Sequence, residues 1–302
     1  MEFRTNIPVY LFFMILICSL SVDSLVITSQ ANWGIEPGFQ KVYVLDESSW
    51  SITYGGLSAT GEGGTFQELR IAQGDSFSIN VVQVDNNYGV EYILENQQEQ
   101  SSTGFVDKAN FIYEFANFLY YPTEEAGRLD QTGFNEEEIM LGPPIISWFF
   151  IEPTEDLWEF LEEVTTLEYH NSLQNADEFE GTLEADFAVE GENKVFDFYL
   201  RGDYINETKN IEIRFDHNIK FIWKISTGLL QGYRISSQFL GEYFGNEISE
   251  ELNVACRVGT YSLPYFKFGG FSGLISGFRM GIVITSGLVI VTIYQLMKKR
   301  KN

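Results

Sequence analysis

The chain has 302 residues, a formal net charge of −24 and 16% aromatic residues. Residues 25–278 contain 13 Lys and Arg against 41 Asp and Glu, and a surface this acidic repels nucleic acid, which excludes a nucleic-acid partner. Only two cysteines are present, and Cys18 lies in the N-terminal apolar segment, so no intramolecular disulfide is possible once that segment is removed.

The N-terminus has the layout of a secretion signal. Arg4 precedes an apolar run at residues 9–20, and the more polar residues 21–24 follow it. The run is shorter than the roughly 20 residues that a membrane-spanning helix needs, which disfavours a retained anchor. The sequence therefore predicts a signal peptide at 1–24, with the exact cleavage site left open.

Residues 25–150 are predicted to form a β-rich region with one helix. Apolar residues recur at every second position around residues 77–81 and 88–94, with a polar turn at 85–87 between them. This alternation favours two antiparallel strands joined by a tight turn. Residues 111–119 instead place Phe111, Phe115 and Phe118 three and four positions apart, which indicates a helix packed on the sheet.

Residues 151–262 are predicted to be a helix followed by an antiparallel β-meander. Thr154 is the expected N-cap, and Leu157, Trp158, Leu161 and Val164 form the apolar stripe of the helix. Alternating strands follow, and we place one two-residue turn at 217–218 and another turn at 191–194. The last strand contains Cys256 on its apolar side, where a packed thiol is expected. Whether the two regions are one domain or two stays open.

The C-terminus is predicted to anchor the chain in a membrane. Residues 280–297 carry no charge and are followed by a basic tail at 298–302. Such a pattern is typical of a single-pass transmembrane helix with a cytoplasmic C-terminus. Residues 263–279 form an aromatic and Gly-rich juxtamembrane linker, and its short length places the ectodomain close to the bilayer.

Few side chains suggest a specific site. Trp158, Leu161 and Trp223 are candidate ligand-binding residues, although packing in a core is the simpler interpretation of an apolar helix face. Asn206 and Thr208 form a glycosylation sequon. Arg201, Gly202 and Asp203 spell an adhesion tripeptide, which chance explains better. The sequence predicts no catalytic residue, metal site or cofactor.

Short structural motifs carry a resemblance to a known family. They are Trp33, Gly34 and Gly38; Gly74, Asp75 and Phe77; residues 153–158; and Ser226, Thr227, Gly228, Leu229 and Leu230. In these residues the chain resembles archaeal cell-surface proteins of the choice-of-anchor S type, which implies an anchored surface location. The expected curved sheet and helix are also loosely similar to bacterial lipoprotein carriers with an unclosed barrel, which hold acyl chains.

The expected fold is mainly β (α+β), with a curved antiparallel sheet or open half-barrel, one or two packed helices and a C-terminal transmembrane helix. The leading hypothesis is a non-enzymatic surface protein in the cell membrane, with its N-terminal ectodomain outside and a protein or lipid partner. Two alternatives are a carrier for an apolar, lipid-like ligand and an extracellular hydrolase.

Overall fold

The computed structural model describes residues 33–119, 145–166 and 179–269, apart from residues 68, 87, 209 and 244. The predicted signal peptide, transmembrane helix and basic tail lie outside these ranges. Within them, no helix combines the length and the apolar character that crossing a membrane requires.

Antiparallel strands make up most of the described chain. The first group is β1 (Gln40–Tyr54), β2 (Leu57–Glu62), β3 (Gly64–Phe66), β4 (Leu69–Ile71), β5 (Ser76–Asp85), β6 (Gly89–Asn96) and β7 (Ser101–Val106). Helices α2 (Lys108–Leu119) and α5 (Glu155–Glu163) follow. The second group is β8 (Phe179–Glu190), β9 (Asn193–Asn206), β10 (Ile211–Lys224), β11 (Leu230–Tyr243) and β12 (Asn246–Val258). These bounds confirm the predicted hairpin, the helix at 111–119 and the meander.

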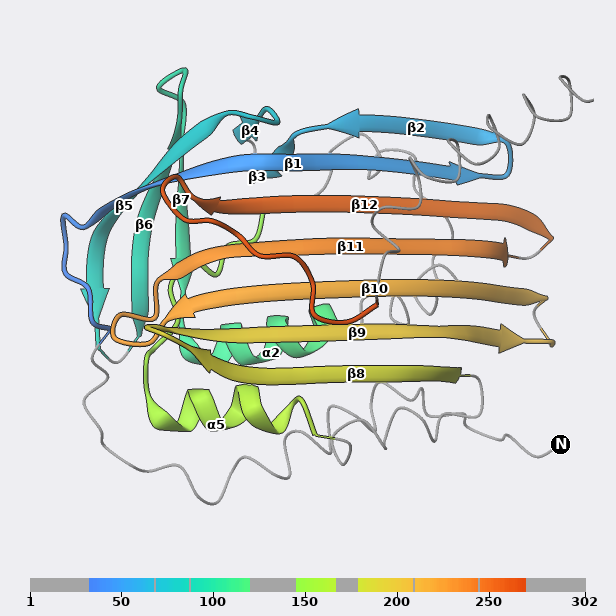
Figure 1. Ribbon diagram of the computed structural model, residues 1–302. Coiled ribbons are helices and arrows are strands. Elements are labelled where there is room, and N and C mark those ends of the chain that lie inside the picture. Colours follow the sequence, from blue (N-terminus) through green and yellow to red (C-terminus); the bar gives the residue numbers. More distant parts are fainter. Residues whose placement is uncertain are drawn as a thin grey trace, which may run out of the picture. The chain divides into compact units, whose positions relative to one another are not determined.

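One ten-stranded open sheet joins both strand groups. Its order is β7-β6-β5-β1-β12-β11-β10-β9-β8, and β2 pairs with β1 off this path. One edge of strand β1 pairs with two different strands: residues 40–44 pair with β5, and residues 49–54 pair with β2. In Figure 1, β5, β6 and β7 turn away from the direction of β8 to β12, while α2 and α5 lie on one side of the sheet. We call this side the helix face.

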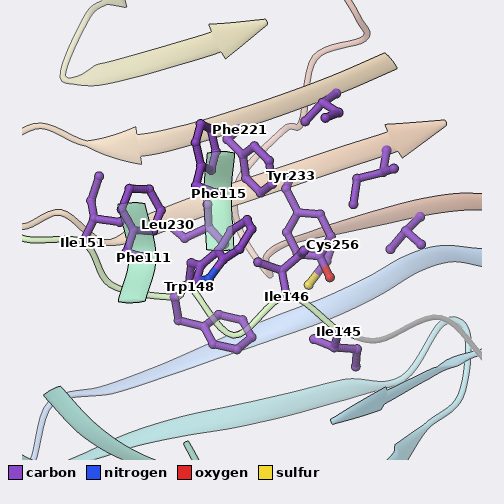
Figure 2. Close-up of a cluster of buried hydrophobic side chains, with 14 of the residues drawn as sticks. Phe111, Phe115, Ile145, Ile146, Trp148, Ile151, Phe221, Leu230, Tyr233 and Cys256 are labelled. Atoms are coloured by element: carbon purple, nitrogen blue, oxygen red, sulfur yellow. The ribbon is translucent and has the colours of Figure 1, made fainter. Parts of the chain in front are cut away.

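Aromatic rings fill the space between α2 and the helix face. Phe115 of α2 lies 5.0 Å from Phe196 and 5.6 Å from Phe221, measured between ring centroids. Trp148, from the segment 145–151, lies 5.7 Å from Phe111. Figure 2 shows Phe111 and Phe115 of the helix, Trp148 of the segment and Phe221 of β10 converging. The predicted helix therefore packs on the sheet as expected, and a segment without regular structure completes the core.

The predicted turn at 217–218 is wrong, because the structure has a continuous strand there. Both residues lie inside β10, where His217 pairs with Leu200 and Ser237 and is fully buried. The reason is that odd-numbered residues of β10 face the core without interruption from Ile211 to Trp223, and His217 continues this series. The free energy gained by burying this whole apolar face exceeds the local preference of two polar residues for a turn.

Two of the motifs behind the family resemblance meet in space. A Cβ at Gly34, which has a φ of +58°, would lie 2.6 Å from the carbonyl oxygen of Ser226. A Cβ at Gly228, with a φ of +61°, would lie 1.8 Å from the carbonyl oxygen of Ile151. Both glycines are therefore required by close backbone approach and left-handed backbone, which gives these motifs a structural role.

Candidate functional site

The most distinctive feature outside the core is a segment that crosses the sheet on the side opposite the helices. Residues 259–269, which we call the strap, leave the end of β12 and run across β11 and β10 toward β9 (Figure 1). We call this side of the sheet the strap face. The strap has no regular secondary structure, so its position depends on individual contacts of its side chains and backbone with the sheet.

Arg257 fixes the start of the strap. Its Nε and Nη2 donate to the two carboxylate oxygens of Asp46 at 2.5 and 3.1 Å, and Nη1 donates to the carbonyl oxygens of Gly259 and Tyr261 at 2.7 and 3.2 Å. Strand β1 is irregular between Leu45 and Glu47, and Asp46 lies at this irregularity. A bulge in β1 therefore supplies the carboxylate that orients the arginine.

A buried ion pair lies further along the strap face. Lys220 Nζ is 2.6 Å from Asp197 Oδ2, and the two side chains are only 5% and 4% exposed. The residues stand directly opposite each other on β10 and β9. The second oxygen of Asp197 accepts a hydrogen bond from the backbone N–H of Lys267 in the strap at 3.1 Å. Burial raises the pKa of Asp197, and its bonds to Lys220 and Lys267 oppose that effect.

The end of the strap is held by both its side chains and its backbone. Lys267 Nζ lies 2.6 Å from Asp186 Oδ2 on β8, and hydrogen bonding to this carboxylate raises the pKa of the lysine. Asn218 Nδ2 donates to the carbonyl oxygen of Phe268 at 2.9 Å. At Gly269, with a φ of +76°, a Cβ would lie 2.6 Å from Asn218 Nδ2 and 2.8 Å from Tyr199 Cε2. Only glycine fits at this position without displacing its neighbours.

A small apolar layer lies on the same face. Val195, Ile222 and Ala255 are buried there although they are not members of the main core cluster. A Cβ at Gly232, which pairs with Ile222 and Arg257, would lie 3.0 Å from Leu263 Cδ1 of the strap. The strap therefore packs closely on the sheet through an apolar contact as well as through polar ones.

Most polar side chains around the strap are bonded to one another or to the strap, although the buried Nε of Arg234 has no hydrogen-bond partner among the described residues. Tyr199 Oη donates to Asp216 Oδ2 at 3.1 Å, and burial raises the pKa of both groups. Carboxylates, lysines and amides of this cluster are bonded to each other or to the strap backbone. A general base or nucleophile needs a free approach for substrate, and the strap covers Asp197 and Lys220.

The predicted ligand-binding residues lie on the helix face and contact different elements. Trp158 is half-buried on α5 and stacks on Phe187 of β8, with ring centroids 6.2 Å apart. Leu161 is completely buried on the same helix. Trp223 is completely buried on β10, where its ring lies 6.0 Å from Phe115. All three belong to or pack against the core cluster, so each has a structural explanation.

The glycosylation sequon lies at the end of β9. Asn206 is half-buried at the last residue of this strand, and Thr208 is exposed in the turn before β10. The prediction that Asn206 is modified remains a prediction.

The adhesion tripeptide lies within β9, where Gly202 is buried and Asp203 Oδ1 accepts a hydrogen bond from Arg214 Nε at 2.8 Å. A tripeptide held inside a strand with its carboxylate paired is not displayed as a flexible adhesion loop.

An acidic hollow lies beside the tripeptide. It has a volume of about 580 Å³ and is lined by residues including Glu212, Glu242 and Glu247. Over the described ranges, no group of three or more His, Cys, Asp or Glu residues could hold a metal ion.

Sequence reasoning did not find the strap. It assigned residues 263–279 to a linker, and the structure places the first part of that linker against the sheet. One signal was present, because Asp197 and Lys220 occupy positions inside otherwise apolar strands. A charge in such a position needs a partner and a cover.

Comparison with protein-family models, curated proteins and solved structures gave no match, so the resemblance to choice-of-anchor S surface proteins stays a prediction.

Proposed function

We propose that this protein is a membrane-anchored extracellular surface protein whose β-rich ectodomain has a structural or interaction role without catalysis. The strap is the observation that carries this proposal. It fastens the chain to the sheet just before the apolar run at 280–297 and the basic residues at 298–301. A fixed exit point is what an ectodomain needs if its membrane helix is to hold it in a defined position.

The alternative of an apolar-ligand carrier finds less support. Such a carrier would need room between the sheet and α2 for an acyl chain. In this region the rings of Phe111, Phe115 and Trp148 are in contact with each other and with the strands. A bound chain would have to displace these rings, at a cost of about 3–5 kcal/mol for each large aromatic side chain that loses its burial.

Membrane extraction tests the anchoring. The full-length protein, tagged at residue 302, should stay in the membrane fraction after alkaline carbonate treatment, and protease added to intact cells should digest the acidic ectodomain. Replacing Leu288 and Ile290 with Arg adds about 5–7 kcal/mol to the insertion free energy by the roughly 2.5–3.5 kcal/mol scale for each central arginine. This double variant should be released into the medium.

The matched control replaces Leu288 and Ile290 with Ala, which keeps the run uncharged and should keep the protein in the membrane. Retention of the arginine variant in the membrane, or protection of the ectodomain from external protease, would contradict the proposal.

A further inference from the structure

The point at which the chain leaves the sheet limits how the ectodomain can sit on its membrane. Gly269 packs against Asn218 and Tyr199, which lie near the middle of the 14-residue strands β10 and β9. Ten residues, 270–279, separate Gly269 from the start of the apolar run. Fully extended, they span at most about 35 Å. The strap face is therefore tethered from its centre by a short connection.

The strap also presents an aromatic side chain suited to a membrane interface. Tyr265 is 79% exposed, and its ring lies 4.7 Å from the guanidinium of Arg234. Rings with an apolar body and a polar tip are favoured at the level of lipid headgroups. Burying such a ring in the interface would remove an exposed apolar surface that the folded chain itself leaves uncovered.

The charge on this face is partly neutralised by ion pairs. Arg214, Lys220, Arg234, Arg257 and Lys267 each pair with a carboxylate on it. At the acidic hollow, Glu212, Glu242 and Glu247 add negative charge. Zwitterionic headgroups should therefore be accepted, whereas an anionic surface should repel this face in low salt.

We propose that the strap face of the sheet is turned toward the bilayer that holds residues 280–297, with zwitterionic lipid headgroups as its partner. This inference rests on the proposed membrane anchoring and adds the orientation of the ectodomain. The helix face, with α2 and α5, then points away from the lipid. The strap is the element that enforces this arrangement, because releasing it would lengthen the tether by up to 11 residues.

Energy transfer from labelled full-length protein to the membrane surface tests the orientation. The chain is reconstituted in phosphatidylcholine vesicles that contain an acceptor-labelled lipid, and flotation first confirms incorporation. Donor dyes are attached at Leu240→Cys on the strap face or at Tyr113→Cys on the outer side of α2, both of which are exposed positions. Cys18 is replaced by Ser in both variants, and Cys256 should not react because it is fully buried and burial raises the pKa of its thiol.

We expect the dye at 240 to lie closer to the lipid surface than the dye at 113 by about 10–20 Å, the thickness of a helix layer on a sheet. Equal distances, or a shorter distance at 113, would overturn the orientation. Protein that fails to float would instead overturn the anchoring, and the orientation with it.

A second variant connects the orientation to the strap. Gly232→Leu should displace Leu263, since even a Cβ at this position comes within 3.0 Å of it. Combined with Lys267→Ala, it should increase the distance measured at 240 while the chain still floats. Replacing one third of the lipid with phosphatidylserine at low salt should also increase this distance, and added salt should reverse the change. A distance at 240 that is unaffected by strap displacement would overturn the role of the strap.

Discussion

The helix face and the strap face belong to the same sheet but are covered by different interactions. On the helix face, α2 and residues 145–151 pack aromatic rings against the strands. The ring of Phe115, for example, contacts the rings of Phe111, Trp148, Phe196, Phe221 and Trp223. On the strap face, a single layer of irregular chain is held by ion pairs, backbone hydrogen bonds and one small apolar layer.

This difference separates what stabilises the fold from what positions one segment on it. Burial of large aromatic side chains contributes several kcal/mol for each ring, whereas an exposed ion pair such as Lys267 with Asp186, which joins the strap to the sheet, contributes about 0–1 kcal/mol. The helix face should therefore open only when the protein unfolds globally. The strap should open locally at a lower free energy, as is common for segments with few buried apolar contacts.

The largest expected effect follows from removing a ring on the helix face. Phe115→Ala should lower the free energy of unfolding by about 4 kcal/mol, because it deletes a fully buried aromatic side chain and leaves a cavity. Urea unfolding of the purified full-length chain in mild detergent, followed by tryptophan fluorescence, measures this change. Tyr113→Ala on the same helix is the matched control, since Tyr113 is 59% exposed and its loss should change stability by only about 0.5 kcal/mol. Similar losses for both variants would contradict the assignment of the core.

A smaller effect is expected from the buried ion pair on the strap face. Asp197→Ala should cost about 3 kcal/mol, because it leaves Lys220 charged and buried without a partner. The double variant Asp197→Leu with Lys220→Met should recover most of this loss, since it removes both charges and preserves volume. The same unfolding measurement applies to both variants.

The exposed pair of Arg214 and Asp203 provides the control for this prediction. Its side chains are 66% and 37% exposed, so Asp203→Ala should cost no more than about 1 kcal/mol. A double variant as unstable as Asp197→Ala would show that the cost comes from lost packing, not from the unpaired lysine.

The same contrast explains how much of the molecule could be predicted from the sequence. The helix face follows from local periodicity: the alternation at residues 88–94 and the three-and-four spacing from Phe111 to Phe118 gave the hairpin and α2. The strap has no period, and its carboxylate partners Asp197 and Asp186 lie 70 and 81 positions before Lys267 along the chain. The charges of Asp197 and Lys220 inside apolar strands indicate that a cover is needed, but the local pattern does not identify the segment that provides it.

The incorrect turn at 217–218 has a related cause. Asn218 was expected in a two-residue turn between strands, but in β10 its amide bonds to Phe268 of the strap, 50 positions later. Trp158, Leu161 and Trp223 were recognised as belonging to apolar faces, and the structure gives each a neighbour in the core. The packing of Trp223 against α2 could not be predicted, because it depends on how the sheet and helix meet.

The pH dependence of stability should sharpen the comparison, since His217 is a buried histidine of the helix face. It is fully buried, and burial lowers its pKa from 6.5 to about 4. Below pH 6.5 the unfolded chain binds a proton that the folded chain refuses until about pH 4, so stability is lost as the pH falls through this window. Between pH 7 and pH 5 the loss from this one group should be about 2 kcal/mol.

The variant His217→Leu isolates this contribution, because every other titratable group is common to both proteins. Asp197 and Asp216 on the strap face act in the opposite direction: burial raises their pKa, so they favour folding at low pH and lose that contribution as the pH rises through the raised value. Their effects cancel in the difference between wild type and variant. The difference in the free energy of unfolding between variant and wild type should shift by about 2 kcal/mol in favour of the variant when the pH is lowered from 7 to 5. A difference that is independent of pH would mean that His217 can take up its proton in the folded state, which would contradict a closed apolar contact between α2 and β10.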